Sequence, residues 1–155
     1  MSNISEAFVA FDTSKLRNAL AIADAGRAGE VRFLGEIENT EAATAKFVRK
    51  LAAKYGLLTF CYEAGPTGYG LYRQIESLGH ACMVVAPSLI PKKPGDRVKT
   101  NRRDALNLVK LLRAGELTAV WVPDRRHEAM RDLARARGAA VEDLRSKRQQ
   151  VPQAD

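Results

Sequence analysis

The sequence has few of the residues that build zinc-bound, disulfide-linked or membrane proteins. Its 155 residues include two cysteines and two histidines, a poor ligand supply for a structural zinc site. No apolar run approaches the roughly 20 residues that a membrane-spanning helix needs, and MSNISEAFVAFD lacks the basic-then-apolar pattern of a secretion signal. We therefore expect a cytoplasmic protein in which Cys61 and Cys82 are free core residues.

Acidic residues are fewer than basic ones, 18 against 25, so the formal net charge is +7 and the isoelectric point is near 9.7. The cations are unevenly placed: the first 91 residues hold only nine of the 25. A basic surface attracts polyanions. We expect six clustered cations to contact nucleic-acid phosphates: Lys92, Lys93, Arg97, Lys99, Arg102 and Arg103.

Hydrophobic patterning predicts a mixed α/β fold. The first three predicted strands are expected to form an antiparallel meander. The strand–helix–strand pattern over 57–86 predicts a parallel crossover. Tyr69 and Trp121 are candidates for base stacking, although VWVP more often indicates core packing. The predicted strands are 7–12, 16–24, 31–38, 57–63 and 80–87, the predicted helices are 41–55, 70–79 and 101–114, and 116–123 is a short extended segment.

The sequence also predicts the cap and the buried face of one helix, and the end of every helix. Asn39 or Thr40 is expected to cap helix 41–55. The residues of that helix that are expected to face inward are Ala45, Val48, Leu51 and Ala52. A glycine follows each helix and is expected to end it.

Acidic side chains fall at the ends of predicted elements. Asp12 closes the first strand, Glu63 closes the fourth, and Asp104 lies one turn after Asn101 at the start of helix 101–114. If the two strands are neighbours, their carboxylates open on one sheet edge, where α/β proteins bind ligands. A helix start across that edge brings Asn101 and Asp104 near them. Such oxygen ligands suit Mg²⁺ or Mn²⁺ and phosphodiester chemistry.

Each of these residues also has an ordinary structural interpretation. Asp12 fits a turn, Glu63 fits a solvated strand end, and Asp104 fits a favourable charge at a helix N-terminus. Asn101 is a good N-cap for a helix over 102–114, with Asp104 in a capping-box-like position. The joint order of strand-end Asp, strand-end Glu and first-turn helix Asp nevertheless favours a ribonuclease-H-like arrangement.

Longer segments carry a more specific signal. The chain resembles the N-terminal, RuvC-like domain of the DEDD transposases of IS110-type insertion sequences, with no obvious gap from about residue 7 to 148. The segments that carry the resemblance are FDTSK (11–15), CYEAGPTGYGLYRQIESLGH (61–80), VVAPSLIPKKPGDRVKTNRRDA (84–105), RAGELTAVWVPD (113–124) and HEAMRDLARAR (127–137).

The resemblance implies a four-acid metal site that holds Mg²⁺ or Mn²⁺ for DNA transposition. By position, catalytic and metal-binding roles fall on Asp12, Glu63, Asn101 and Asp104. Bridging RNA of the mobile element is expected as a guide, DNA as the substrate and the bacterial nucleoid as the place of action. Asn101 departs from the family, which commonly has aspartate there, so the site has one negative charge fewer.

The resemblance also implies a domain plan. Residues 1–124 are expected to form the RuvC-like domain, and 125–155 a charged helical arm that starts a coiled coil and joins copies of the chain. The family's C-terminal serine domain is expected to be absent, which makes the chain a catalytic-domain fragment of a transposase or recombinase, inactive alone for transposition. The alternative is a non-catalytic nucleic-acid-binding and dimerisation module with a decayed acid site. A small-molecule kinase of the actin-like superfold is disfavoured, because DTSKLRN offers no glycine-rich phosphate loop.

Overall fold

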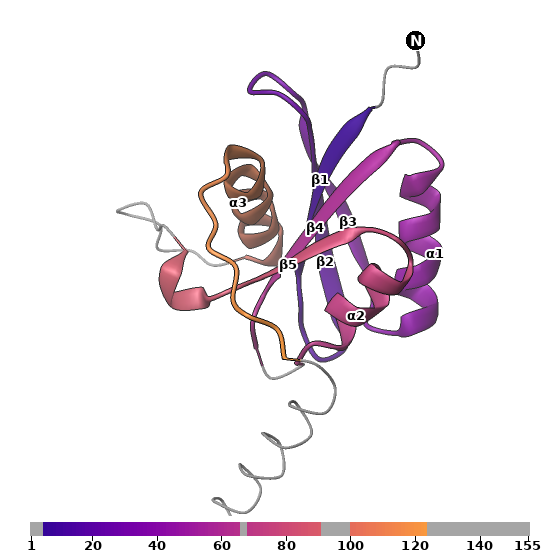
Figure 1. The fold of residues 1–155 in the computed structure, drawn as a ribbon. Coiled ribbons are helices and arrows are strands. Elements are labelled where there is room, and N and C mark those ends of the chain that lie inside the picture. The colour runs from indigo at the N-terminus through magenta and orange to yellow at the C-terminus, as the bar shows by residue number, and fades with distance from the viewer. Residues whose placement is uncertain (1–4, 66–67, 91–99, 124–155) are drawn as a thin grey trace, which may run out of the picture. The chain divides into compact units, whose positions relative to one another are not determined.

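The computed structural model describes residues 5–65, 68–90 and 100–123 (Figure 1). The chain divides into two units, Met1–Trp121 and Val122–Asp155, and every element below belongs to the first. The helical arm predicted over 125–155 lies outside the described residues. The elements are β1 (Glu6–Asp12), β2 (Arg17–Asp24), β3 (Val31–Glu38), α1 (Glu41–Ala52), β4 (Leu57–Glu63), α2 (Gly70–Ser77), β5 (Ala81–Val85), the short 3₁₀ helix η1 (Pro87–Leu89) and α3 (Asn101–Ala114).

The strands form one mixed sheet in the order β3-β2-β1-β4-β5. The first three strands pair antiparallel as a meander, whereas β4 runs parallel to both β1 and β5. Parallel pairing of β4 with β5 needs the crossover that α2 provides. The predicted ribonuclease-H-like α/β sheet is therefore confirmed, with β1 in its centre.

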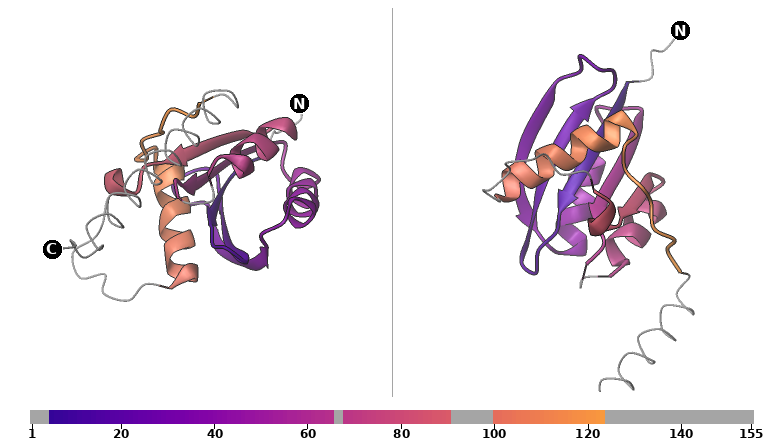
Figure 2. Two further views of the ribbon diagram at one scale, coloured as in Figure 1. Left: turned by 90° about the horizontal axis from the view of Figure 1, so that it is seen from below. Right: turned by 90° about the vertical axis from the view of Figure 1, so that its left-hand side faces the viewer.

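The two faces of the sheet carry side chains of different size, because alternate residues of a strand point to opposite faces. One face presents large side chains, and Phe11 there meets Phe47 of α1 with ring centroids 6.2 Å apart. Figure 2 shows α1 and α2 on this side and α3 on the other. Most of the fully buried strand residues under α3 are small, namely Ala10, Ala19, Ala21, Ala23 and Cys61, and larger, partly buried residues such as Phe8, Phe33 and Met83 pack around them. Small side chains let the helix backbone approach the sheet closely.

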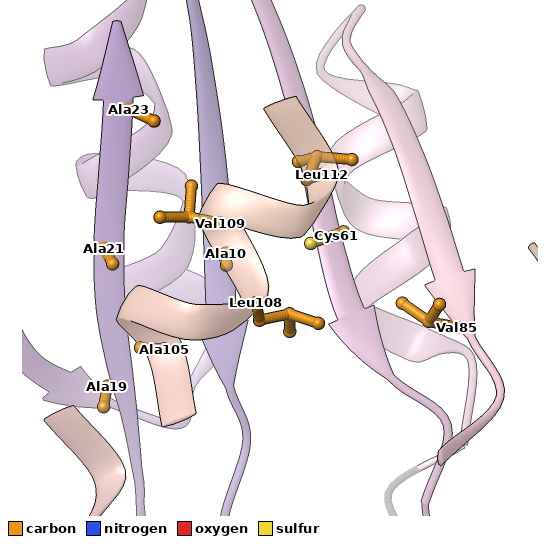
Figure 3. Packing of buried hydrophobic residues seen from close by; sticks show 10 residues of the cluster. All are labelled: Ala10, Ala19, Ala21, Ala23, Cys61, Val85, Ala105, Leu108, Val109 and Leu112. Atoms are coloured by element: carbon orange, nitrogen blue, oxygen red, sulfur yellow. The ribbon is translucent and has the colours of Figure 1, made fainter. Parts of the chain in front are cut away.

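Helix α3 packs on this small-residue surface through one stripe (Figure 3). Its buried residues recur at helical spacing: Ala105, Leu108, Val109 and Leu112. The helix spans the predicted residues 101–114 and ends at Gly115, whose φ of 73° is left-handed and suits glycine. Arg113 fixes this end of the helix, because its Nη1 donates to the carbonyl oxygens of Asp24 at 3.2 Å and Gly29 at 2.7 Å.

Helix α1 differs from its prediction in phase and length. Thr40 is the N-cap, since its Oγ1 accepts the Ala43 N–H at 3.1 Å. The inward stripe includes Thr44 with Val48 and Leu51, while Ala52 is exposed. The prediction of Ala52 as an inward residue was wrong because the stripe follows the i, i+4, i+7 spacing from Thr44. The helix ends at Ala52, before the predicted residue 55.

Other core predictions have mixed outcomes. Both cysteines are free thiols, as expected; Cys61 is buried and Cys82 is half-buried. The core packing expected for Trp121 was wrong, because this residue is 70% exposed. It follows a segment that adds to the sheet edge, where the Val120 N–H donates to the Val84 carbonyl at 2.8 Å. Among the described residues, no helix has the length and hydropathy to cross a membrane.

Candidate metal and nucleic-acid site

Asp12 and Glu63 lie together at one edge of the sheet. Phe11 pairs with Tyr62 in the parallel β1–β4 register, and the two acids are the next and last residues of these strands. Neighbouring strands lie about 4.8 Å apart. Both carboxylates belong to the α3 face, because each residue follows, by two positions, a side chain that packs under α3 (Ala10 and Cys61). The structure therefore brings two of the predicted ligands side by side.

The other two predicted ligands lie on the first turn of α3. Thr100 is the N-cap of this helix, because its Oγ1 accepts the Arg103 N–H at 3.0 Å. Asn101 is therefore the first helical residue, and the interpretation of Asn101 as the N-cap was wrong. Asn101 is exposed and Asp104 is half-buried. Both residues precede Leu108 on the helix at spacings that place them near its side of the surface.

The direction of α3 separates this turn from Glu63. Figure 3 shows Ala105 beside Ala19 of β2, and Leu112 beside Cys61 of β4. At its start the helix also reaches β3, where the Arg102 guanidinium lies 5.4 Å from the centre of the Phe33 ring. The first turn of α3 thus lies over β2 and β3.

Asp12 stands between the two parts of the candidate site. It pairs with Ala19 of β2, so the first turn of α3 lies on one side of Asp12 and Glu63 on the other. In the described ranges, no group of three or more His, Cys, Asp and Glu residues is arranged to hold a metal ion. The donor chemistry fits a divalent ion; the described residues supply an adjacent pair of carboxylates on the strands and a third, Asp104, on the first turn of α3.

The loop after Asp12 is held by a hydrogen-bond network that the sequence analysis missed. Asn18 is fully buried on β2; its Oδ1 accepts the Ser14 N–H at 3.2 Å, and its Nδ2 donates to Asn39 Oδ1 at 3.2 Å. Asn39 Nδ2 in turn donates to the carbonyls of Ser14 at 2.9 Å and Lys15 at 3.4 Å. The available signal was a lone asparagine in the apolar strand RNALAIAD.

A second contact orders the turn after Glu63. The buried Tyr62 hydroxyl donates to the Gly68 carbonyl at 3.0 Å. Burial raises the pKa of Tyr62, and nearby Cys82 adds to the effect. The hydroxyl therefore stays protonated and keeps this bond over the ordinary pH range.

The predicted phosphate-binding residues divide between described and undescribed segments. Arg102 and Arg103 are exposed on α3, and Arg102 uses one face of its guanidinium on Phe33. The residues Lys92, Lys93, Arg97 and Lys99 lie outside the described residues. Two further exposed cations lie close to Asp12 in sequence: Lys15 in the β1–β2 loop and Arg17 at the start of β2.

Comparison with known proteins identifies relatives along nearly the whole chain. A model of the IS110-type DEDD transposase family matches residues 9–154. The putative transposase y4qE of Sinorhizobium fredii is 65% identical over 151 residues, which cover 97% of this chain and 39% of that protein. The transposase for insertion sequence element IS1533 of Leptospira borgpetersenii is 38% identical over 117 residues, which cover 75% of this chain and 34% of that protein. The chain therefore spans less than half the length of either relative.

Two solved structures are similar at low identity. The RuvC of T. thermophilus, in complex with a Holliday junction substrate, aligns with a TM-score of 0.44 and 9% identity over 74% of this chain and 99% of that one. The catalytic core domain of BIV integrase aligns with a TM-score of 0.32 and 13% identity over 66% and 63%. Similarities of this size carry no inference about function.

Proposed function

Because the chain belongs to the IS110-type DEDD transposase family, we propose that it supplies the RuvC-like catalytic domain of a DNA transposase or recombinase. The observation that carries the proposal is the placement of Asp12 and Glu63 at adjacent ends of the two central parallel strands. This edge is where ligands bind in open α/β sheets. Family membership and the strand-end carboxylates thus point to the same chemistry.

The proposed metal ligands are Asp12 and Glu63, completed by Asp104 and by the amide oxygen of Asn101. Mg²⁺ or Mn²⁺ bound there would stabilise the charge that develops on a phosphodiester. The chain's own part is to hold two carboxylates on adjacent strands and to carry Asp104 on α3, whose far end Arg113 anchors. A complete site requires the first turn of α3 and the strand edge to approach each other, and we propose that bound nucleic acid favours this approach.

DNA is the proposed substrate, and the bridging RNA of the mobile element is the proposed guide. The proposed contacts to phosphates are the six cations Lys92, Lys93, Arg97, Lys99, Arg102 and Arg103. The basic second half of the chain supports this assignment, because each neutralised phosphate contributes to affinity through counterion release. We also propose that copies of the chain associate through residues 125–155. The sequence of that segment is typical of a charged helix with only a narrow row of apolar residues, which suits pairing with another helix.

A specific observation favours a second candidate, a nucleic-acid-binding and dimerisation module without catalysis. The described residues contain no group of three acidic or other ligating side chains arranged for a metal ion, and Asn101 replaces the carboxylate expected from the family. Both features would follow if the acid site had decayed while the fold and the basic surface were kept.

One experiment separates the two candidates. The chain and its Asn101→Asp variant are incubated with Mn²⁺ and branched DNA, and binding and strand cleavage are measured together, with Asp12→Asn as the inactive control. The catalytic proposal expects cleavage that increases in Asn101→Asp and disappears in Asp12→Asn. Binding by all three proteins with no cleavage by any would favour the module.

A further inference from the structure

The loop between β1 and β2 is longer and more firmly held than a simple reversal requires. β1 ends at Asp12 and β2 begins at Arg17, so residues 13–16 turn the chain, and the first β1–β2 pair after the turn is Asp12 with Ala19. A hairpin can reverse direction with about two residues. The extra residues follow Asp12 directly, so the conformation of the loop and the position of the proposed ligand are coupled.

A buried amide holds this loop from beneath. Asn18 and Thr44 are the buried polar side chains among the residues that the structure describes. Burial of an amide is unfavourable unless its polar atoms are hydrogen-bonded, and Asn18 satisfies this condition through Ser14 and Asn39. The amide therefore stabilises one loop conformation, since any other would leave buried polar atoms unpaired.

Asn39 holds the same loop from the side. Its backbone N–H donates to the Leu16 carbonyl at 2.9 Å, and its side chain donates to the carbonyls of Ser14 and Lys15. Ser14 Oγ adds a local bond to the Arg17 carbonyl. Three successive loop carbonyls are thus bound by one residue that lies beyond β3.

The held loop presents its charged side chains to solvent. Lys15 and Arg17 are exposed, and Leu16 between them is 78% exposed. Arg17 has Glu36 at 3.9 Å as a partner. In the described part of the chain Lys15 has no ion pair, so its ammonium group is available to an external anion.

We propose that Asn18 and Asn39 are positioning residues that hold the β1–β2 loop in the conformation in which Lys15 contacts a nucleic-acid phosphate beside Asp12. The inference rests on the proposed function, because the anion is taken to be the backbone of the bound DNA. An ordered loop loses less conformational entropy when it binds, which explains why a buried amide is used for an exposed turn.

The test is the salt dependence of DNA binding by the 155-residue chain, measured by fluorescence anisotropy with a branched DNA. Each phosphate contact contributes about 0.9 to the slope of log K against log salt. Lys15→Gln should therefore reduce the slope by about 1. The matched control Lys46→Gln, an exposed lysine on α1, should leave the slope unchanged.

The positioning role needs its own variant, and Asn39→Ala suits it because Asn39 is exposed and is not the helix cap. Hydrogen exchange at the Ser14 and Arg17 amides should accelerate, DNA affinity should fall about three- to tenfold, and the slope should stay as in the wild type. Acceleration with unchanged affinity, unchanged exchange, or a wild-type slope in Lys15→Gln would each overturn the inference. If the wild-type chain binds no DNA, the proposed function fails as well.

Discussion

Asp12 and Glu63 occupy the last positions of two neighbouring parallel strands, one residue beyond the Phe11–Tyr62 pair. This relationship follows from the register of β1 and β4 alone and does not depend on any loop. It places two carboxylates on the α3 face of the sheet, where a third, Asp104, is carried on the first turn of that helix. The strand register therefore fixes the positions of Asp12 and Glu63. The position of Asp104 depends instead on how α3 packs on the sheet.

The seating of α3 requires small residues beneath it. Replacing Ala21 with leucine should force the helix away from the sheet and lower the free energy of unfolding by about 1–3 kcal/mol, because Ala21 is fully buried in the α3 interface. Urea denaturation measures this loss. Ala42→Leu, at an exposed position of α1, should change stability by less than about 0.5 kcal/mol, and equal losses in the two variants would contradict this packing.

The start of α3 depends on Thr100 rather than on Asn101. Thr100→Ala should lower the free energy of unfolding by about 1 kcal/mol, because the Arg103 N–H loses its acceptor. Thr100→Ser should keep most of the stability. A larger loss from Asn101→Ala than from Thr100→Ala in thermal denaturation would mean that the cap has been assigned to the wrong residue.

The raised pKa of the half-buried Cys82 thiol should make the stability of the fold fall at alkaline pH. Burial raises the pKa of Cys82 from 9.0 to about 12, so the folded state keeps this proton after the unfolded state has lost it. The resulting stabilisation is complete below pH 9 and is lost as the pH rises from 9.0 toward 12. Unfolding free energies of the wild type and Cys82→Ala should therefore converge over this interval, and a constant difference would argue against the raised pKa.

Restoring a carboxylate at position 101 should strengthen metal binding. Affinity for hard cations depends on ligand charge, and Asn101→Asp should raise the affinity for Mn²⁺ about tenfold, which corresponds to about 1.4 kcal/mol. Calorimetric titration measures the change. Asn107→Asp adds the same charge at an exposed position further along α3 and serves as the control; an equal gain there would mean that net charge, rather than ligation, causes the effect.

Local chemistry made much of the fold predictable. The bounds of β3, β4 and α3 follow from alternation, a continuous apolar run and a terminal glycine, and the structure reproduces them. The order of the acids along the chain predicted the shared edge because a parallel crossover places strand ends together. These features depend on residues close in sequence or on general rules of sheet connection.

The remaining features depend on contacts between distant residues. Thr100 and Asn101 are both good caps by residue type, and the backbone at position 100, with φ −129° and ψ 149°, decides between them. The Asn18–Asn39 bond joins residues 21 positions apart, and no local pattern indicates it. The oblique path of α3, which carries Asp104 over β2, follows from the packing of one helix stripe on four alanines and a cysteine. The direction in which α3 crosses the sheet therefore cannot be predicted from the sequence of the helix alone.

If the strand-end acids bind a divalent ion, loss of one of their carboxylates must weaken that binding, and Mn²⁺ titration by calorimetry measures the loss. Wild type is compared with Glu63→Gln and with Glu116→Gln, which removes an exposed carboxylate beyond the end of α3. Glu63→Gln should lose at least about tenfold in Mn²⁺ affinity, while Glu116→Gln should bind like the wild type. Equal affinities of the wild type and Glu63→Gln would contradict metal binding by the strand-end acids.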